Sequence, residues 1–302
     1  MQHLNPSTAQ RALQIRASCS LDRIAFDEFA VPTVIQVAVI SCPSVDAMSA
    51  ALEFRDISVI AANERRLLDR VSLAIEEGTV TAVIGRSGSG KTTLLRTANR
   101  MIEPASGEVL VAGASEKDVV ALRRKIGYVI QETGLFPHLT IERNVGIILE
   151  AEGRPREQRS ARVRELLQLV GLDPASFAHR YPHQLSGGQR QRAGLARALA
   201  AEARILLMDE PFGALDPLTR AEMQDMLRDL LKRVKTTVLL VTHDLDEALY
   251  LAARIVLMKE GKILVDVPSE EFLLSNHPEI VSYAAAFHRG EARKSSHEGG
   301  TP

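Results

Sequence analysis

The 302-residue sequence has little cysteine and no long apolar run. Its two cysteines, Cys19 and Cys42, both fall near the N-terminus, so the remainder of the chain has no disulfide framework. No stretch approaches the roughly 20 uninterrupted apolar residues that cross a bilayer as a helix. We therefore expect any role at a membrane to be exercised through another chain.

An excess of either charge is also lacking. Lys plus Arg number 37 and Asp plus Glu number 38, which leaves a formal net charge of −1. Because nucleic-acid-binding domains commonly carry a basic field, this balance gives no support to a nucleic-acid partner. With 45% hydrophobic and 25% charged residues, the composition is that of an ordinary globular chain that can bury a sizeable core.

The two ends of the chain differ from the middle. Regular alternation of strands and helices begins only at about residue 50. We expect residues 1–49 to be an extension that is disordered, or that reflects a start assigned too early, since Met48 directly precedes the first expected strand. Residues 288–302 are mostly polar, and we expect them to form a disordered tail.

An apolar run at residues 29–42, FAVPTVIQVAVISC, has some features of an export signal that ends at a lipid-modified cysteine, Cys42. Acidic residues precede the run where such signals carry positive charge, and Pro32 interrupts it. We therefore favour the interpretation that this run is not a signal, with export as the alternative.

From residue 50 onward, short apolar strands alternate with helix-forming stretches, which is typical of a parallel sheet covered on both faces. The long helical stretch at residues 141–201 indicates an inserted helical subdomain. After two strands within residues 50–75, we expect strands at residues 79–84, 126–130, 205–208, 237–241 and 255–258, and helices from residue 90 and at residues 218–233 and 245–252.

Residues 85–92, GRSGSGKT, match the phosphate-binding loop G-x-x-x-x-G-K-[ST] and lie between an apolar strand and a helix. The glycines let backbone N–H groups curl around a phosphate, and the helix N-terminus adds a positive dipole end. Lys91 would neutralise the β- and γ-phosphates of a nucleotide, and the Thr92 hydroxyl would bind Mg²⁺. The residues predicted to contact the nucleotide here are Gly85, Arg86, Ser87, Gly88, Ser89, Gly90, Lys91, Thr92 and Thr93.

An apolar strand at residues 205–208 ends in two carboxylates, Asp209 and Glu210. Carboxylates at the C-terminal end of a buried parallel strand lie on the edge of the sheet where ligands bind. Asp209 would hold Mg²⁺ through a water molecule, and Glu210 would polarise the attacking water. Such a pair alone is more often a solvated strand end, but its combination with a phosphate-binding loop favours the catalytic interpretation.

Residues 185–189, LSGGQ, open a helix-forming run in which Ser186 can cap the helix and two glycines leave backbone N–H groups open to a phosphate. One chain has no need of two such anion sites for a single nucleotide. LSGGQ is the signature of ABC ATPases, which the chain resembles over about residues 50–287. In this family the signature of one subunit closes over the γ-phosphate held by its partner, which implies nucleotide contacts from Ser186, Gly187, Gly188 and Gln189.

The resemblance implies further roles. Gln131 corresponds to the glutamine that senses Mg²⁺ and the attacking water, Asp216 to the residue that crosses the dimer interface, and His243 to the histidine that contacts the γ-phosphate. It therefore implies ATP and Mg²⁺ as cofactors, with Glu210, His243 and Gln131 catalytic and with Thr92, Gln131 and Asp209 at the metal.

The family fold implied by the resemblance is α/β: a P-loop NTPase core with a mostly parallel sheet, a small antiparallel β subdomain, and an inserted helical subdomain at about residues 139–201.

The sequence departs from the family pattern at the residue that would contact the adenine base of the nucleotide. The family usually places an aromatic residue some way before the phosphate-binding loop to stack on adenine, but residues 60–64 contain none and Ala62 stands at about the expected place.

Within the family, the segments around Gln131, LSGGQ, Asp209 and His243 look like those of bacterial importer ATPases for quaternary amines such as glycine betaine and choline. This implies a homodimer or a paired ABC ATPase subunit, membrane permease subunits, an indirect link to a solute-binding protein, and a peripheral position at the cytoplasmic face of the inner membrane. The alternatives are an importer for another solute, such as an amino acid or sulfonate, and a non-transport ABC ATPase.

Residues 133–139, TGLFPHL, place apolar side chains beside turn-forming Gly and Pro directly after Gln131. We expect this loop and the helical subdomain to form the socket for a permease, because the family grips a short cytoplasmic helix in that neighbourhood. The alternative is that Phe136 and its neighbours only seal the joint between subdomains.

Overall fold

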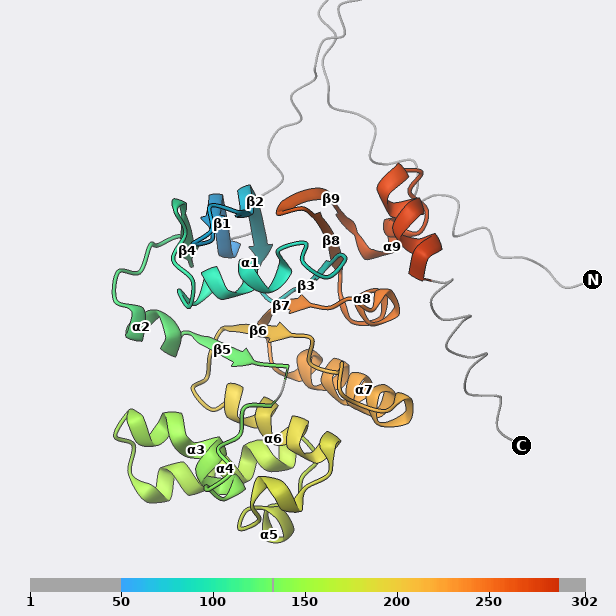
Figure 1. The fold of residues 1–302 in the computed structure, drawn as a ribbon. Helices are drawn as coiled ribbons and strands as arrows, with labels where there is room; N and C mark the ends of the chain where they lie inside the picture. Colours follow the sequence, from blue (N-terminus) through green and yellow to red (C-terminus); the bar gives the residue numbers. More distant parts are fainter. Residues whose placement is uncertain (1–49, 132, 288–302) are drawn as a thin grey trace, which may run out of the picture. The chain divides into compact units, whose positions relative to one another are not determined.

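A computed structural model describes residues 50–131 and 133–287 of the chain (Figure 1). The expectations for residues 1–49 and 288–302 therefore lie outside the described residues. Within the part that is described, no helix is both long enough and apolar enough to cross a membrane.

A six-stranded sheet forms the centre of the fold, with strand order β5-β6-β7-β3-β8-β9. Its first five strands run parallel, and the edge strand β9 is antiparallel to β8. Residues on β6 and β7 are buried at every position, which explains the apolar runs at residues 205–208 and 238–241. The strands are β3 (Val80–Ile84), β5 (Ile126–Val129), β6 (Ile205–Asp209), β7 (Thr237–Val241), β8 (Arg254–Lys259) and β9 (Lys262–Pro268).

A second sheet of three antiparallel strands has the order β2-β1-β4. The strands are β1 (Ala50–Ile60), β2 (Arg66–Glu76) and β4 (Ser106–Val111). Helix α1 (Lys91–Ala98) buries Leu94 and Leu95 in a core shared by this sheet and one face of the six-stranded sheet. The predicted α/β class, with a mostly parallel sheet and a small antiparallel one, is confirmed.

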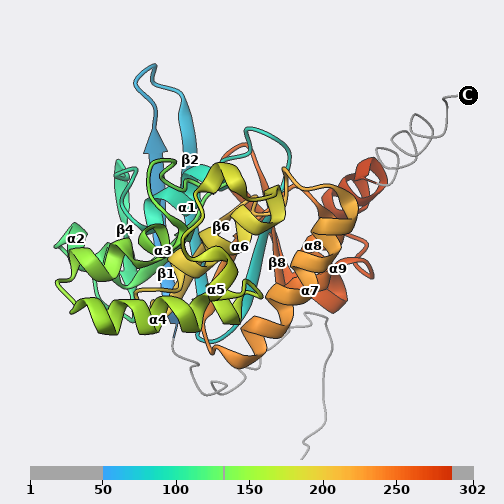
Figure 2. The ribbon, with the colours of Figure 1, turned by 90° about the horizontal axis from the view of Figure 1, so that it is seen from below.

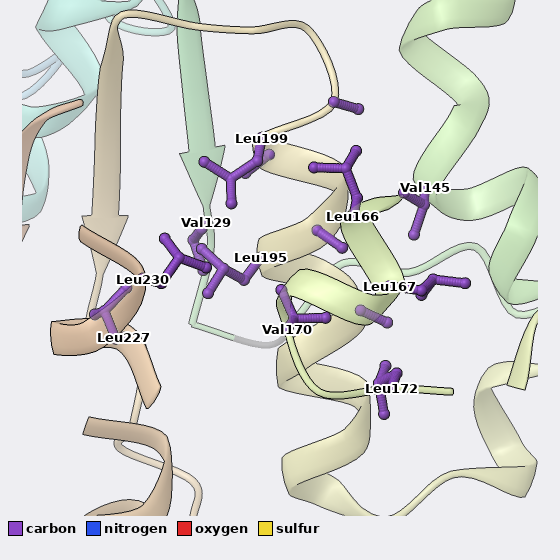
Figure 3. Packing of buried hydrophobic residues seen from close by; sticks show 14 of the residues in the cluster. Val129, Val145, Leu166, Leu167, Val170, Leu172, Leu195, Leu199, Leu227 and Leu230 are labelled. Carbon is purple, nitrogen blue, oxygen red and sulfur yellow. The ribbon is translucent and has the colours of Figure 1, made fainter. Parts of the chain in front are cut away.

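Four helices fall within residues 139–201: α3 (Ile141–Ala151), α4 (Arg156–Leu169), α5 (Pro174–Phe177) and α6 (Gly187–Ala198). They gather beside the β5 end of the central sheet (Figure 1). Leu195 of α6 and the following Leu199 lie between Val129 of β5 on one side and Leu166 and Val170 on the other (Figure 3). Helix α6 therefore joins the helical region to the sheet.

Of the remaining helices, α2 packs against β5, α8 against β3 and α9 against β8 and β9, and α7 runs beside α8 (Figure 2). Figure 2 also shows the β1–β2 hairpin projecting from the fold. Residues 278–287 are helical as well. The helices are α2 (Val119–Arg124), α7 (Pro217–Arg233), α8 (Leu245–Leu251) and α9 (Ser269–Phe272).

Candidate functional site

The loop between β3 and α1 needs glycine for its conformation. Gly85 and Gly90 have φ of 151° and 104°, in the region that L side chains rarely adopt. A Cβ atom on Gly85 would lie 2.3 Å from the carbonyl oxygen of Met258, and one on Gly90 would lie 2.9 Å from that of Leu67. The loop is thus held between β8 and the start of β2, and only glycine fits at these two positions.

The predicted phosphate-binding lysine is buried against this loop. Lys91 Nζ donates to the carbonyl oxygens of Gly85 at 2.8 Å and Arg86 at 3.2 Å. Burial lowers the pKa of Lys91, while the nearby carboxylates of Glu210 and Asp209 oppose that shift. The ammonium group therefore lies in the concave loop with neutral carbonyl partners, where a phosphate would be a stronger partner.

The first turn of α1 meets the end of β6 through two oxygen-bearing side chains. Thr92 Oγ1 donates to Asp209 Oδ1 at 2.9 Å, and Tyr128 Oη donates to Asp209 Oδ2 at 3.4 Å. A hydroxyl and a carboxylate are the hard oxygen donors that Mg²⁺ takes when phosphate and water complete its shell. The donor set of Thr92 and Asp209 fits that ion, and Gln131, the third predicted ligand, donates elsewhere.

Glu210 brings three of the predicted residues together. Gln131 Nε2 donates to Glu210 Oε2 at 3.2 Å, and His243 Nδ1 lies 3.4 Å from the same oxygen. The backbone of Glu210 is left-handed, with φ of 45°, and its N–H donates to the carbonyl of Val241 at 2.8 Å. A non-glycine residue in this conformation is strained, and such strain is characteristic of functional sites.

A hollow of about 430 Å³ lies over the loop. Residues 87–93, including the predicted Thr93, line it together with Glu210. Arg65, Arg66 and Leu67, at the turn between β1 and β2, line it too. We did not predict these three, because the sequence offered no aromatic residue in the turn and nothing local shows that the hairpin approaches the loop.

The signature sequence lies outside this hollow. Ser186 caps α6: its Oγ accepts from Gln189 N at 3.3 Å, while Gln189 Oε1 accepts from Ser186 N at 3.0 Å. Ser186 and Gly187 are exposed, and Gly188 is buried. The folded chain therefore presents this helix terminus at its surface, and does not bring it to the loop that holds Lys91.

Asp216 has a similar structural role at the next helix. Its Oδ1 accepts from Thr219 N at 3.0 Å and so caps α7. The same hydrogen bond lowers the pKa of Asp216. Thr219 also packs on the signature helix, because a Cβ atom on Gly188 would lie 2.6 Å from its methyl carbon. The predicted dimer-interface residue and the signature thus lie on adjoining helix ends.

The loop after Gln131 is held by two side chains that we did not predict to be important. Buried Asn144 accepts from Phe136 N at 2.7 Å and donates to Phe136 O at 3.0 Å. Arg197 donates to the carbonyls of Gly134 at 2.6 Å and Thr133 at 2.8 Å. Phe136 remains 43% exposed. The sequence signal that could have revealed such side chains is a polar residue on an otherwise apolar face of a helix.

The sequence also matches known proteins. A protein-family model described as ABC transporter matches residues 68–213, a range that contains the β3–α1 loop, the signature and the acidic end of β6. The glycine betaine/carnitine/choline transport ATP-binding protein OpuCA of Bacillus subtilis is 47% identical over 222 residues, which cover 72% of this chain and 58% of OpuCA. The chain thus spans less than two thirds of that relative.

The glycine betaine uptake system ATP-binding protein YehX of Escherichia coli is 44% identical over 215 residues, which cover 70% of this chain and 69% of YehX. Among solved structures, the dimeric post-hydrolysis state of the ATP-binding cassette MJ0796 bound to ADP and Pi has a TM-score of 0.64 and 33% identity, with 72% of this chain and 98% of that chain covered. The fold, the family model and these identities agree, and the chain belongs to the ABC transporter family.

Proposed function

We propose that this chain binds and hydrolyses ATP as a subunit of an ABC importer. The observation that carries the proposal is the convergence of Gln131 and His243 on one oxygen of Glu210, at 3.2 and 3.4 Å. Glu210 lines the same hollow as Lys91 and Thr92. A carboxylate with two nitrogen-bearing partners beside a phosphate-binding loop suits the activation of a water next to a phosphate.

Binding would begin at the β3–α1 loop, where backbone N–H groups of the glycine-rich turn and the α1 terminus face the phosphates. Lys91 would exchange its two carbonyl partners for phosphate oxygens. Arg65 and Arg66 add planar cationic groups to the lining, and guanidinium groups can stack on a base. This supports nucleotide binding by a chain whose segment before the loop lacks an aromatic ring.

Thr92 and Asp209 would hold Mg²⁺, which when bound would neutralise charge on the phosphate oxygens. Their 2.9 Å hydrogen bond supports this assignment, since the two oxygen atoms that would bind the ion already lie next to each other. Gln131 would serve at Glu210 by orienting the attacking water. Tyr128 would keep the Asp209 carboxylate in place through its hydroxyl.

In the hydrolytic step, the oxygen of a water bonds to the γ-phosphorus while the bond from that phosphorus to the β,γ-bridging oxygen breaks. Glu210 would take up the proton that the water loses, and ADP and inorganic phosphate would leave. His243, 3.4 Å from Glu210, would contact the γ-phosphate from the end of β7. The side chain of His243 is 60% exposed, which leaves it accessible to a bound nucleotide.

The working unit would be a dimer with two shared nucleotide sites. Ser186 and Gly187 are exposed and absent from the hollow over the loop, so they can serve a phosphate only in another subunit. Asp216, at the adjoining end of α7, would cross the same interface. The similar MJ0796 cassette has a dimeric structure, which supports the arrangement. The partner would be a second copy or a paired ABC ATPase subunit.

The transported solute is proposed to be a quaternary amine or related osmoprotectant. The names of OpuCA and YehX, which include glycine betaine, support this solute class. An importer for an amino acid or sulfonate is the alternative. The chain would act at the cytoplasmic face of the inner membrane, held by permease subunits that also receive a solute-binding protein, with residues 133–139 in the socket.

Uptake in cells tests the proposal. A strain that lacks the gene would be supplied with the wild-type chain or the Glu210→Gln variant, and uptake of labelled choline, glycine betaine, an amino acid and a sulfonate would be compared. Restoration of quaternary-amine uptake by the wild type alone is the expected result. If only another solute is restored, the solute assignment is wrong; if the purified chain has no ATPase activity, the enzymatic proposal is wrong.

A further inference from the structure

The residues on either side of His243 are tied together by one buried acid. Thr242 Oγ1 donates to Glu247 Oε2 at 3.1 Å and accepts from Asp244 N at 3.0 Å. Asp244 Oδ1 in turn accepts from the backbone N–H of Glu247 at 3.0 Å and so caps α8. The two chain neighbours of His243 therefore belong, with Glu247, to a closed ring of hydrogen bonds.

The surroundings of Glu247 favour its neutral form. It is 4% exposed, and burial together with the neighbouring charge of Asp244 raises its pKa to about 8. Arg220 on α7 and Glu210 after β6 also face it, with opposite effects. Oε2 accepts from Thr242, whereas Oε1 has no hydrogen-bond partner among the described residues.

The ring is anchored to two other parts of the fold. Arg220 contacts Asp244 Oδ2 at 3.4 Å and donates to the carbonyl of Leu215 at 3.2 Å, next to Asp216. Tyr283, in the helical segment at residues 278–287, donates to the backbone carbonyl of His243 at 3.3 Å. The backbone at His243 is thus fixed from α7, from α8 and from that last helical segment.

The His243 side chain needs such support because it makes few contacts that would hold it in place. It is 60% exposed, and its one close polar contact among the described residues is Glu210. A catalytic group on an exposed strand end keeps its position only if the backbone that carries it is held. A displacement of about 1 Å can cost a hundredfold in rate.

We propose that Glu247 is a positioning residue for His243, which it acts on through Thr242 and Asp244. The inference rests on the proposed ATPase function and deepens it, since it names what sets the place of the histidine at the γ-phosphate. Glu247 is not among the residues that line the hollow over the phosphate-binding loop.

Steady-state hydrolysis of MgATP by the full chain tests the inference with two substitutions at one position. Glu247→Leu keeps a side chain of similar size and removes the acceptor for Thr242, so we expect kcat to fall about tenfold or more while KM for ATP stays within about threefold. Glu247→Gln keeps a neutral side chain with an acceptor oxygen, so it should recover most of the rate that leucine loses. Thermal melting of each variant confirms that it is folded.

Asp246→Asn is the matched control, because Asp246 lies in the same turn of α8 but is exposed. We expect its kcat to match the wild type. Equal rates for wild type and Glu247→Leu, or a fall in Glu247→Leu that is all in KM, would overturn the inference. Absence of ATPase activity in the wild type would instead refute the proposed function.

A double-mutant cycle separates positioning from general damage. In a His243→Ala background, Glu247→Leu should lower the residual single-turnover rate less than twofold, because the group it positions is gone. A full second loss in that background contradicts the inference. The ratio of wild-type to Glu247→Gln kcat should also fall about threefold or more between pH 7 and 9, as Glu247 ionises next to Asp244. A constant ratio contradicts it as well.

Discussion

Thr92 Oγ1 lies 2.9 Å from Asp209 Oδ1, although 117 positions separate the two residues in the sequence. They meet because β3 and β6 are both neighbours of β7 in a parallel sheet, so their C-terminal ends share one edge. Helix α1 starts at that edge, and its first turn faces the acidic end of β6. The contact links the phosphate-binding loop to the carboxylates through the strand order itself.

This contact predicts that Thr92 contributes to Mg²⁺-dependent nucleotide binding. Thr92→Val keeps the shape of the side chain and removes the oxygen, so we expect affinity for ATP with Mg²⁺ to fall about tenfold or more. Affinity for ATP measured with a chelator should change little. Calorimetric titration with and without Mg²⁺ checks the difference, and an equal loss in both conditions would contradict a metal role.

Glu210 is predicted to be the general base. Glu210→Gln keeps the hydrogen-bonding shape and loses the basic oxygen, so kcat should fall by about 10²- to 10⁴-fold. The dissociation constant for MgATP should stay within about threefold. Glu202→Gln, a change at an exposed glutamate paired with Arg154, is the control and should match the wild type. Near-normal hydrolysis by Glu210→Gln would rule out this role.

The signature helix is predicted to bind the nucleotide of a partner subunit. Gly187 can accept a side chain, because a Cβ atom there would meet only Leu215 Cδ2 at 3.7 Å. Gly187→Asp should therefore leave the fold and MgATP binding intact, yet place a negative charge where a phosphate would dock. In a Glu210→Gln background, light scattering should show dimers with MgATP, and Gly187→Asp should abolish them. Persistent dimers would exclude the sandwich arrangement.

Much of this architecture could be predicted from local sequence, because the strands that carry the site are buried on both faces. Apart from Asp209 at the end of β6 and Thr237 at the start of β7, the sequences of these two strands are apolar, so the predicted bounds agree with the structure within one residue. Strand β9 was missed because its sequence, KILVDVP, contains the charged residues Lys262 and Asp266 and lies at the sheet edge, where one side needs no apolar cover.

The missed parts of the site depend on contacts between distant elements. Asn144 and Glu247 read as ordinary polar residues of helices, and only the packed fold shows that both are buried with specific hydrogen-bond partners. Arg65 reaches the hollow only because the β1–β2 hairpin packs beside the phosphate-binding loop. Periodicity places Asn144 on the apolar face of α3, but the hydrogen-bond partners of Asn144 and Glu247 and the approach of the hairpin do not follow from periodicity or composition.

Glu247 should make stability depend on pH. Its folded-state pKa of about 8 lies above its ordinary 4.5, so the folded state holds a proton that the unfolded state has lost. Stability from this group is full below about pH 4.5 and is lost as pH rises towards 8, by up to about 1.4 kcal/mol per pH unit. Urea unfolding from pH 5 to 8 should show wild type losing stability relative to Glu247→Gln. Parallel curves would contradict a neutral buried acid.

The loop that follows Gln131 is predicted to transmit nucleotide-driven closure to a permease. Asn144 and Arg197 hold the backbone at Phe136 and Gly134 by hydrogen bonds while Phe136 stays 43% exposed, so the described part of the loop presents an apolar residue on a hydrogen-bonded backbone. Closure can do work on a permease only if the permease's states differ in contact free energy with the closed dimer, and an exposed ring on a fixed loop can supply such a contact.

Phe136→Ala should therefore leave MgATP hydrolysis by the isolated chain within about twofold of the wild type, since the ring does not line the hollow. Association with the permease should weaken by about tenfold, because truncation of a central aromatic residue in an interface commonly costs about 1 kcal/mol or more of binding free energy. Val120→Ala, at an exposed apolar residue on α2, is the matched control and should leave association unchanged. Co-purification and uptake in reconstituted vesicles measure both effects. If assembly and coupled uptake survive Phe136→Ala, residues 133–139 are not the socket, and the exposed ring only covers the joint between the sheet and the helical region.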